Sequence, residues 1–85
     1  SRFLPCSEVA AVNVSIPGEW TGISAELLQI ITDCMDYAVK TGGLFDITAS
    51  PESSGLPLSE KLEVDVERCA VRRLSASVRI DLSVL

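Results

Sequence analysis

The chain has 85 residues, enough for one small domain, and seven Lys plus Arg against twelve Asp plus Glu give it a formal net charge of −5. Its cations are scattered, with Arg72 and Arg73 the only adjacent pair, so we do not expect the positive surface that nucleic acid requires. Apolar residues make up 47% of the chain, too many for a disordered segment, but no run approaches the roughly 18 apolar residues of a membrane-spanning helix.

Residues 1–22 are predicted to be an irregular lead-in, because prolines and glycines interrupt them. Within this segment, residues 9–16 could form one helical turn or a short strand. Asn13-Val14-Ser15 matches the N-glycosylation pattern, which we interpret as a chance match. Residues 1–6 have neither the charged nor the apolar region of a signal peptide, so no signal peptide is expected in this chain.

A helix is predicted over residues 25–41. Ser24 is a good N-cap, and Glu26 places a negative charge in the first turn, where the helix dipole favours it. Gly42-Gly43 is expected to end the helix, because glycine adopts the left-handed conformation without a steric penalty. Apolar residues recur at three- and four-residue steps, which is typical of a helix packed on a sheet: Leu27, Ile30, Ile31, Cys34 and Ala38.

The remainder of the chain is predicted to be loop followed by strands. Residues 44–48 read as a strand-like run, and residues 49–59 are rich in Pro, Ser and Gly, so a loop without core residues is expected there. From Leu62 the sequence alternates, with Leu62, Val64 and Val66 on one face and Glu63, Asp65 and Glu67 on a solvated face. Short strands at 71–74 and 78–82 would complete an antiparallel meander or hairpin over residues 62–82.

These elements predict an α+β fold, in which one long amphipathic helix packs on a small antiparallel sheet. A chain this short buries only about 60–65% of its unfolded surface. We therefore expect a homo-oligomer or a complementary partner chain to contribute to its stability.

The cysteines and the lack of histidine exclude several kinds of site. The sequence has no His, the commonest general base and metal ligand, so Ser-His-Asp and Cys-His catalytic units are excluded. Cys6, Cys34 and Cys69 are widely spaced and form no CxxC pair, which argues against a zinc site or a disulfide framework. Cys34 is expected to be a buried apolar residue, and a single Cys6–Cys69 bridge remains an open alternative.

Two stretches together resemble a known family. Residues 1–13, SRFLPCSEVAAVN, are similar to the "SRFxPxSExxxxN" opening of the ApbE family, the FAD:protein FMN transferases, and residues 41–48, TGGLFDIT, are similar to its "TGGxFDxT" signature. Between them, IPGEW followed by ISAELL resembles the family's lead-in to its first long helix. Residues 78–83, VRIDLS, resemble the strand that precedes its Lys-Gly loop. Residues 50–59 are shortened and altered relative to this pattern.

The resemblance implies a flavin-transferase fold (T-fold-like) and a Mg²⁺-dependent activity, in which FAD donates FMN to a Ser or Thr of a flavin acceptor protein. Such proteins usually act in the bacterial periplasm, often as membrane-anchored lipoproteins. By similarity, Asp81 would stand at the end of the strand that presents a phosphate-contacting loop. The FAD pocket would be lined by Gly42, Gly43, Phe45, Asp46 and Thr48.

The chain also departs from the family pattern. The Lys-Gly loop that would follow Leu85 and the downstream Mg²⁺-holding positions are absent from these residues, so no metal ligands and no catalytic residue are assigned, and the chain alone is expected to be inactive. Two hypotheses follow. The first is a fragment or reduced relative of the transferase that retains part of the flavin-binding half; the second is a non-catalytic oligomerisation or partner-binding module on the same scaffold.

The signature residues also have structural interpretations. Gly42-Gly43 could simply stop a helix, and Phe45 could be a core aromatic residue. Asp46 is the more informative residue, because a strand-like run between Phe45 and Ile47 has no evident need for a charge. Its alternative role is to cap a neighbouring turn. On the flavin hypothesis, Asp46→Ala should weaken FAD binding with little loss of fold stability.

Overall fold

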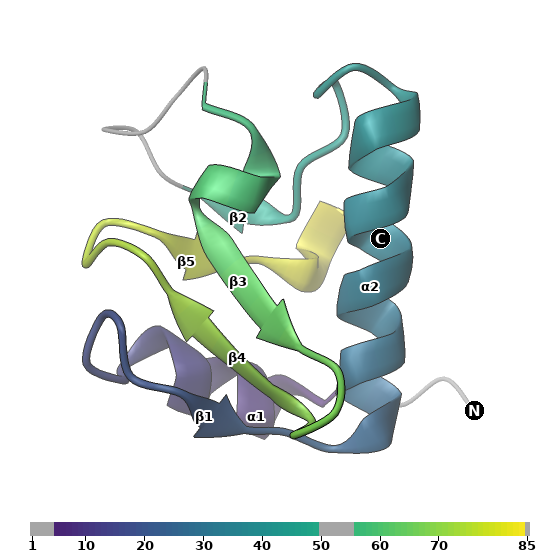
Figure 1. Cartoon of the computed structure of the whole chain (residues 1–85). Helices are drawn as coiled ribbons and strands as arrows, with labels where there is room; N and C mark the ends of the chain where they lie inside the picture. Colours follow the sequence, from purple (N-terminus) through teal and green to yellow (C-terminus); the bar gives the residue numbers. More distant parts are fainter. Residues whose placement is uncertain (1–4, 50–55, 85) are drawn as a thin grey trace.

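The computed structural model describes residues 5–49 and 56–84. The fold belongs to the α+β class, as predicted, and helix α2 runs along one side of the molecule beside the strands (Figure 1). Neither of the two α-helices in these ranges is long and apolar enough to cross a bilayer. In chain order the elements are α1 (Cys6–Asn13), β1 (Thr21–Gly22), α2 (Ala25–Lys40), β2 (Thr48–Ala49), β3 (Leu62–Asp65), β4 (Ala70–Arg73) and β5 (Arg79–Ile80), with 3₁₀ helices at Leu58–Glu60 and Leu82–Val84.

Helix α1 corrects the prediction that residues 1–22 are irregular. It begins after Pro5, whose carbonyl accepts a hydrogen bond from the Val9 N–H at 3.1 Å. Only Val9 and Val12 of this helix are buried, so it lacks the broad apolar stripe from which an amphipathic helix is predicted. Its stability comes from tertiary contacts with β4 and β5.

Helix α2 begins directly after its predicted N-cap, Ser24. The Ser24 hydroxyl accepts a hydrogen bond from the Leu27 N–H at 3.1 Å, and Glu8 of α1 in turn accepts from both the N–H and the hydroxyl of Ser24, at 2.8 and 2.6 Å. The helix ends at Lys40, one residue before the predicted end. Its buried face comprises Leu27, Ile31, Cys34 and Ala38.

The strands form two antiparallel sheets. The larger has the order β1-β4-β3, with Val64 opposite Val71, and the smaller pairs β2 with β5. The predicted meander over residues 62–82 is therefore only partly correct, because β3 and β4 form a hairpin but β5 pairs with β2. Val66, predicted to share the buried face of Leu62, lies beyond the end of β3 and is 64% exposed.

The core lies between α2 and the sheets and joins residues from both ends of the chain, including Val12, Ile31, Leu62 and Ile80. Leu58 also belongs to it, although residues 49–59 were predicted to be a loop without core residues. Ala49 ends β2 and Leu58 begins a 3₁₀ helix, while residues 50–55 of that predicted loop lie outside the described residues.

Two polar side chains fasten α1 to the sheets. The Asn13 amide donates to the Ile80 carbonyl at 3.0 Å and accepts from the Ile80 N–H at 2.7 Å. Arg73 is 4% exposed, and its guanidinium donates to four backbone carbonyls, which satisfies a buried charge without a carboxylate partner. These carbonyls belong to Val12, Ser15, Ala76 and Val78.

The three cysteines are free thiols. Cys34 is buried in the core, as expected. Cys6 is exposed and Cys69 is half-buried, so the Cys6–Cys69 bridge that the sequence left open is not formed in this structure.

Candidate functional site

A broad open hollow of about 880 Å³ lies between the C-terminal end of α2, the segment 42–49 and the segment 56–61. Five of the six residues proposed for the flavin site line it, namely Gly42, Gly43, Phe45, Asp46 and Thr48. The segment that carries the family signature therefore forms one wall of this hollow. The other lining residues are Met35, Ala38, Val39, Ala49, Leu56, Pro57, Leu58, Ser59 and Lys61.

Gly42 and Gly43 turn the chain from α2 into this wall. Both have positive φ angles, +64° and +89°, in the region where glycine carries no steric penalty. The Gly43 N–H donates to the Ala38 carbonyl at 2.9 Å and the Gly42 N–H to the Val39 carbonyl at 3.1 Å. This pair of bonds is the Schellman motif that ends a helix. The glycine pair thus has the predicted helix-ending role and also lines the hollow.

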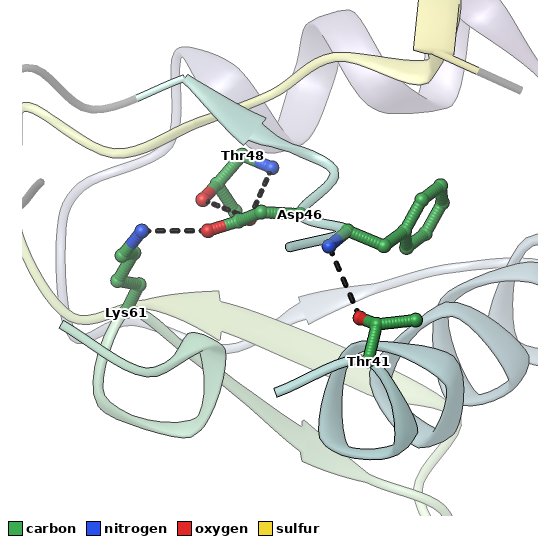
Figure 2. A network of polar contacts seen from close by, with 5 residues as sticks. Thr41, Asp46, Thr48 and Lys61 are labelled. Atoms are coloured by element: carbon green, nitrogen blue, oxygen red, sulfur yellow. Dashed lines mark hydrogen bonds and ion pairs between the residues drawn. The ribbon is translucent and has the colours of Figure 1, made fainter. Parts of the chain in front are cut away.

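Asp46 lines the hollow and accepts three hydrogen bonds, which Figure 2 shows. Its Oδ1 accepts from the N–H and the hydroxyl of Thr48, at 2.7 and 2.6 Å, and its Oδ2 accepts from Lys61 Nζ at 2.7 Å. The bonds to Thr48 make an Asx turn, which is the capping role considered as the alternative for this residue. Asp46 thus lines the hollow and also has structural partners in Thr48 and Lys61.

Lys61 is the site residue that the sequence analysis missed. Its side chain is only 6% exposed, against 25% for Asp46. Fifteen residues separate the two in the chain, so no local pattern links them. The one available signal was the lysine itself, a long cation immediately before the buried end of an alternating strand. This ion pair explains the Asp between Phe45 and Ile47, because the Asp46 carboxylate neutralises the buried ammonium of Lys61.

The environment of Asp46 keeps it ionised. Burial acts to raise the pKa of this carboxyl, but hydrogen bonds from Lys61 and Thr48 and the charge of Lys61 together outweigh it, and the pKa lies below its ordinary value. At neutral pH Asp46 is therefore a carboxylate, and it lines the hollow beside Lys61.

Phe45 contributes an aromatic side chain to the wall. Its ring packs edge-on against Tyr37 of α2, with centroids 5.0 Å apart and an interplanar angle of 70°. Its N–H donates to the Thr41 hydroxyl at 3.1 Å, which fixes the backbone just after the helix (Figure 2). Phe45 is half-buried against the core and also lines the hollow.

Asp81 does not join the other proposed residues. It lines a separate hollow of about 360 Å³ with Cys6, Val9, Ile80, Leu82 and Ser83. Its Oδ1 accepts from the Ser83 N–H at 2.9 Å, and the hydrogen bonds with Ser83 lower the pKa of this exposed carboxyl. The Asp81 side chain thus stabilises the turn into the last 3₁₀ helix.

A metal centre is not assembled by the described residues. Within residues 5–49 and 56–84, no three His, Cys, Asp or Glu side chains lie close enough together to hold an ion. Asp46, a carboxylate that lines the hollow, is already bonded to Lys61 and Thr48.

The chain is similar to one family of known proteins. The model of the ApbE family matches residues 1–56 of the 85. No curated protein and no solved structure matches the chain. The matched span holds the opening stretch and the signature residues Gly42 to Thr48, but it ends before Lys61 and before residues 78–83. Since it covers more than half of the sequence, the chain belongs to the ApbE family and is a relative of the flavin transferases.

Proposed function

We propose that the chain binds FAD in the hollow formed by the signature segment, and that it serves as the flavin-binding part of an FMN transferase. The observation that carries the proposal is the convergence of Gly42, Gly43, Phe45, Asp46 and Thr48 on one wall. A volume of about 880 Å³ lies within the range of small-molecule and cofactor sites.

The chemistry of the hollow suits a flavin. Apolar side chains supply surface on which a flat, mostly apolar ring system can pack, and a few polar groups remain to orient it. The apolar surface comes from Met35, Val39, Phe45, Leu56 and Leu58, and the polar groups come from Asp46, Ser59 and Lys61.

The reaction that the family carries out would use this site for its donor. FAD would lie in the hollow, and a Ser or Thr hydroxyl oxygen of an acceptor protein would form a phosphoester bond with the FMN phosphorus. The pyrophosphate bond of FAD would break, AMP would leave, and the hydroxyl proton would be released; Mg²⁺, when bound, would stabilise the negative charge on the phosphates. The described residues contribute binding and orientation of the flavin to this scheme, and the catalytic residue and metal site are assigned to none of them.

The test is a titration of FAD with the 85-residue chain, in which quenching of the flavin fluorescence reports binding. Val39 is 81% exposed and lines the hollow, whereas Val14 is 80% exposed and is not among the lining residues. Val39→Glu and Val14→Glu therefore add the same charge at equal exposure. We expect Val39→Glu to weaken FAD binding about tenfold, because a carboxylate would face an anionic ligand, and Val14→Glu to change it less than about twofold.

A chain that leaves FAD fluorescence unchanged, or two variants that weaken binding equally, would contradict the proposal. The second candidate function, an oligomerisation or partner-binding module, would then be favoured. The observation in its support is the exposure of Tyr37, Val39 and Leu44 near the end of α2, at 54%, 81% and 92%. It predicts an oligomer in size-exclusion chromatography that Leu44→Ser dissociates.

A further inference from the structure

The signature segment has few hydrogen-bond donors to offer to a ligand. Protein sites often bind phosphate through free backbone N–H groups, but five N–H groups of this wall already have acceptors within the protein. The Gly42 and Gly43 N–H groups donate to the carbonyls of Val39 and Ala38, respectively, and the Leu44 N–H donates to the Thr41 carbonyl. The Phe45 N–H donates to the Thr41 hydroxyl, and the Thr48 N–H donates to Asp46 Oδ1. The Thr48 hydroxyl also donates to Asp46. An anionic part of a ligand therefore needs donors other than these five N–H groups and the Thr48 hydroxyl.

Lys61 is the lining residue with donors to spare. An ammonium has three N–H bonds, and one of them is directed at Asp46 Oδ2 at 2.7 Å. Within the described residues no other acceptor receives a hydrogen bond from Nζ. Of the described residues that line the hollow, Lys61 is also the only cation. Since its side chain is only 6% exposed, Lys61 has lost most of its water, and among the described residues Asp46 alone accepts a hydrogen bond from it.

The Asp46 carboxylate accepts only one hydrogen bond from the Lys61 ammonium, and both of its oxygens already accept hydrogen bonds. Oδ1 accepts two hydrogen bonds from Thr48, and Oδ2 accepts the one from Lys61. Asp46 therefore positions Nζ, while the three donors around the carboxylate offset its negative charge. The Ser59 hydroxyl lines the same hollow and can supply a further donor.

We infer that the Lys61 ammonium, positioned by Asp46, donates a hydrogen bond to a phosphate oxygen of the flavin nucleotide. This contact makes the hollow selective for phosphorylated flavins over riboflavin. This inference rests on the proposed function, since it names the group that recognises the phosphate of the same ligand. Lys61 lies outside the part of the chain that the family model matches. Its role is therefore argued from the contacts in this structure.

The experiment compares riboflavin, FMN and FAD in fluorescence titrations of the 85-residue chain. We expect the unmodified chain to bind FMN and FAD more tightly than riboflavin. Lys61→Gln should weaken FMN and FAD at least tenfold, because a charge-assisted hydrogen bond is lost, and should change riboflavin affinity less than about twofold. Lys61→Arg, which keeps the positive charge, should retain most of the difference between FMN and riboflavin.

The outcomes separate this inference from the proposed function. If the unmodified chain binds no flavin, the proposed function fails and the inference fails with it. If flavins bind but Lys61→Gln weakens riboflavin and FMN by the same factor, Lys61 has only a structural role and the inference alone is overturned. Circular dichroism would show whether Lys61→Gln folds. If it does not, the affinities for FMN and riboflavin are compared in Lys61→Arg and in the double variant Asp46→Asn/Lys61→Gln. Loss of the phosphate preference in the double variant, with riboflavin still bound, supports the inference, and a retained preference overturns it.

Discussion

Replacing Asp46 by alanine should destabilise the fold, contrary to what the sequence alone suggested. The substitution removes the acceptor of Lys61 Nζ and the acceptor of both Thr48 donors. Lys61 cannot recover its water easily, because its side chain is only 6% exposed. Asp46→Ala therefore leaves a nearly buried ammonium without its negative partner.

The magnitude follows from these contacts. Breaking a buried ion pair costs about 3–5 kcal/mol when both groups are fully enclosed, but Asp46 is 25% exposed and lines an open hollow. Water that enters from that side reduces the cost to about 2 kcal/mol. The loss of the Thr48 hydrogen bonds adds about 1 kcal/mol, so the free energy of unfolding should fall by about 3 kcal/mol.

A double-mutant cycle measured by urea unfolding, with circular dichroism as the signal, isolates the ion pair. Asp46→Ala, Lys61→Met and the double variant are compared with the unmodified chain. In the Lys61→Met background, Asp46→Ala should cost only the Thr48 contribution of about 1 kcal/mol, which gives a coupling energy of about 2 kcal/mol between the two residues. The reasoning is refuted if Asp46→Ala costs less than about 1 kcal/mol, or if its cost is the same in both backgrounds.

Two further predictions concern the same contacts and the attachment of α1. Because the pKa of Asp46 is lowered in the folded state, its contribution should be constant above the unfolded pKa of about 3.9 and should be lost as pH falls through the folded value. The stability difference between the unmodified chain and Asp46→Asn should thus shrink below about pH 4 in urea unfolding at stepped pH, and a difference that grows there would contradict the assignment. Asn13→Ala should cost about 2 kcal/mol, because it leaves the N–H and the carbonyl of Ile80 unpaired. In the same assay Asn13→Asp, which keeps the acceptor alone, should recover part of that loss, and equal effects of the two variants would count against a two-bond contact.

The sequence predicted α2 well because the signals that define it are local. Ser24 accepts a hydrogen bond from a residue three positions away, and the bonds of Gly42 and Gly43 reach back only three and five residues. Such contacts depend on residue types at fixed spacing, which a sequence displays directly. The hairpin of β3 and β4 is similarly local, since its pairing reaches from Asp65 to Ala70.

What the sequence did not predict depends on residues far apart in the chain. Helix α1 has a weak apolar pattern and is secured by Asn13 and Ile80, which are 67 positions apart. Likewise, β5 pairs with β2 and not with the nearer β4. The candidate site divides in the same way. The signature positions were visible as a motif in the sequence. Lys61 is 15 residues from Asp46, so their contact exists only in the folded chain.

The bond between Asn13 and Ile80 also closes an edge of the smaller sheet. Successive residues of a strand direct their backbone groups to alternate sides, and the Asp81 N–H bonds the Ile47 carbonyl on the β2 side. The N–H and the carbonyl of Ile80 therefore point away from β2, where the Asn13 amide meets both as a peptide group of a third strand would. With that place taken, an incoming chain cannot extend the ladder at this residue, so one asparagine side chain protects β5 against edge-to-edge aggregation.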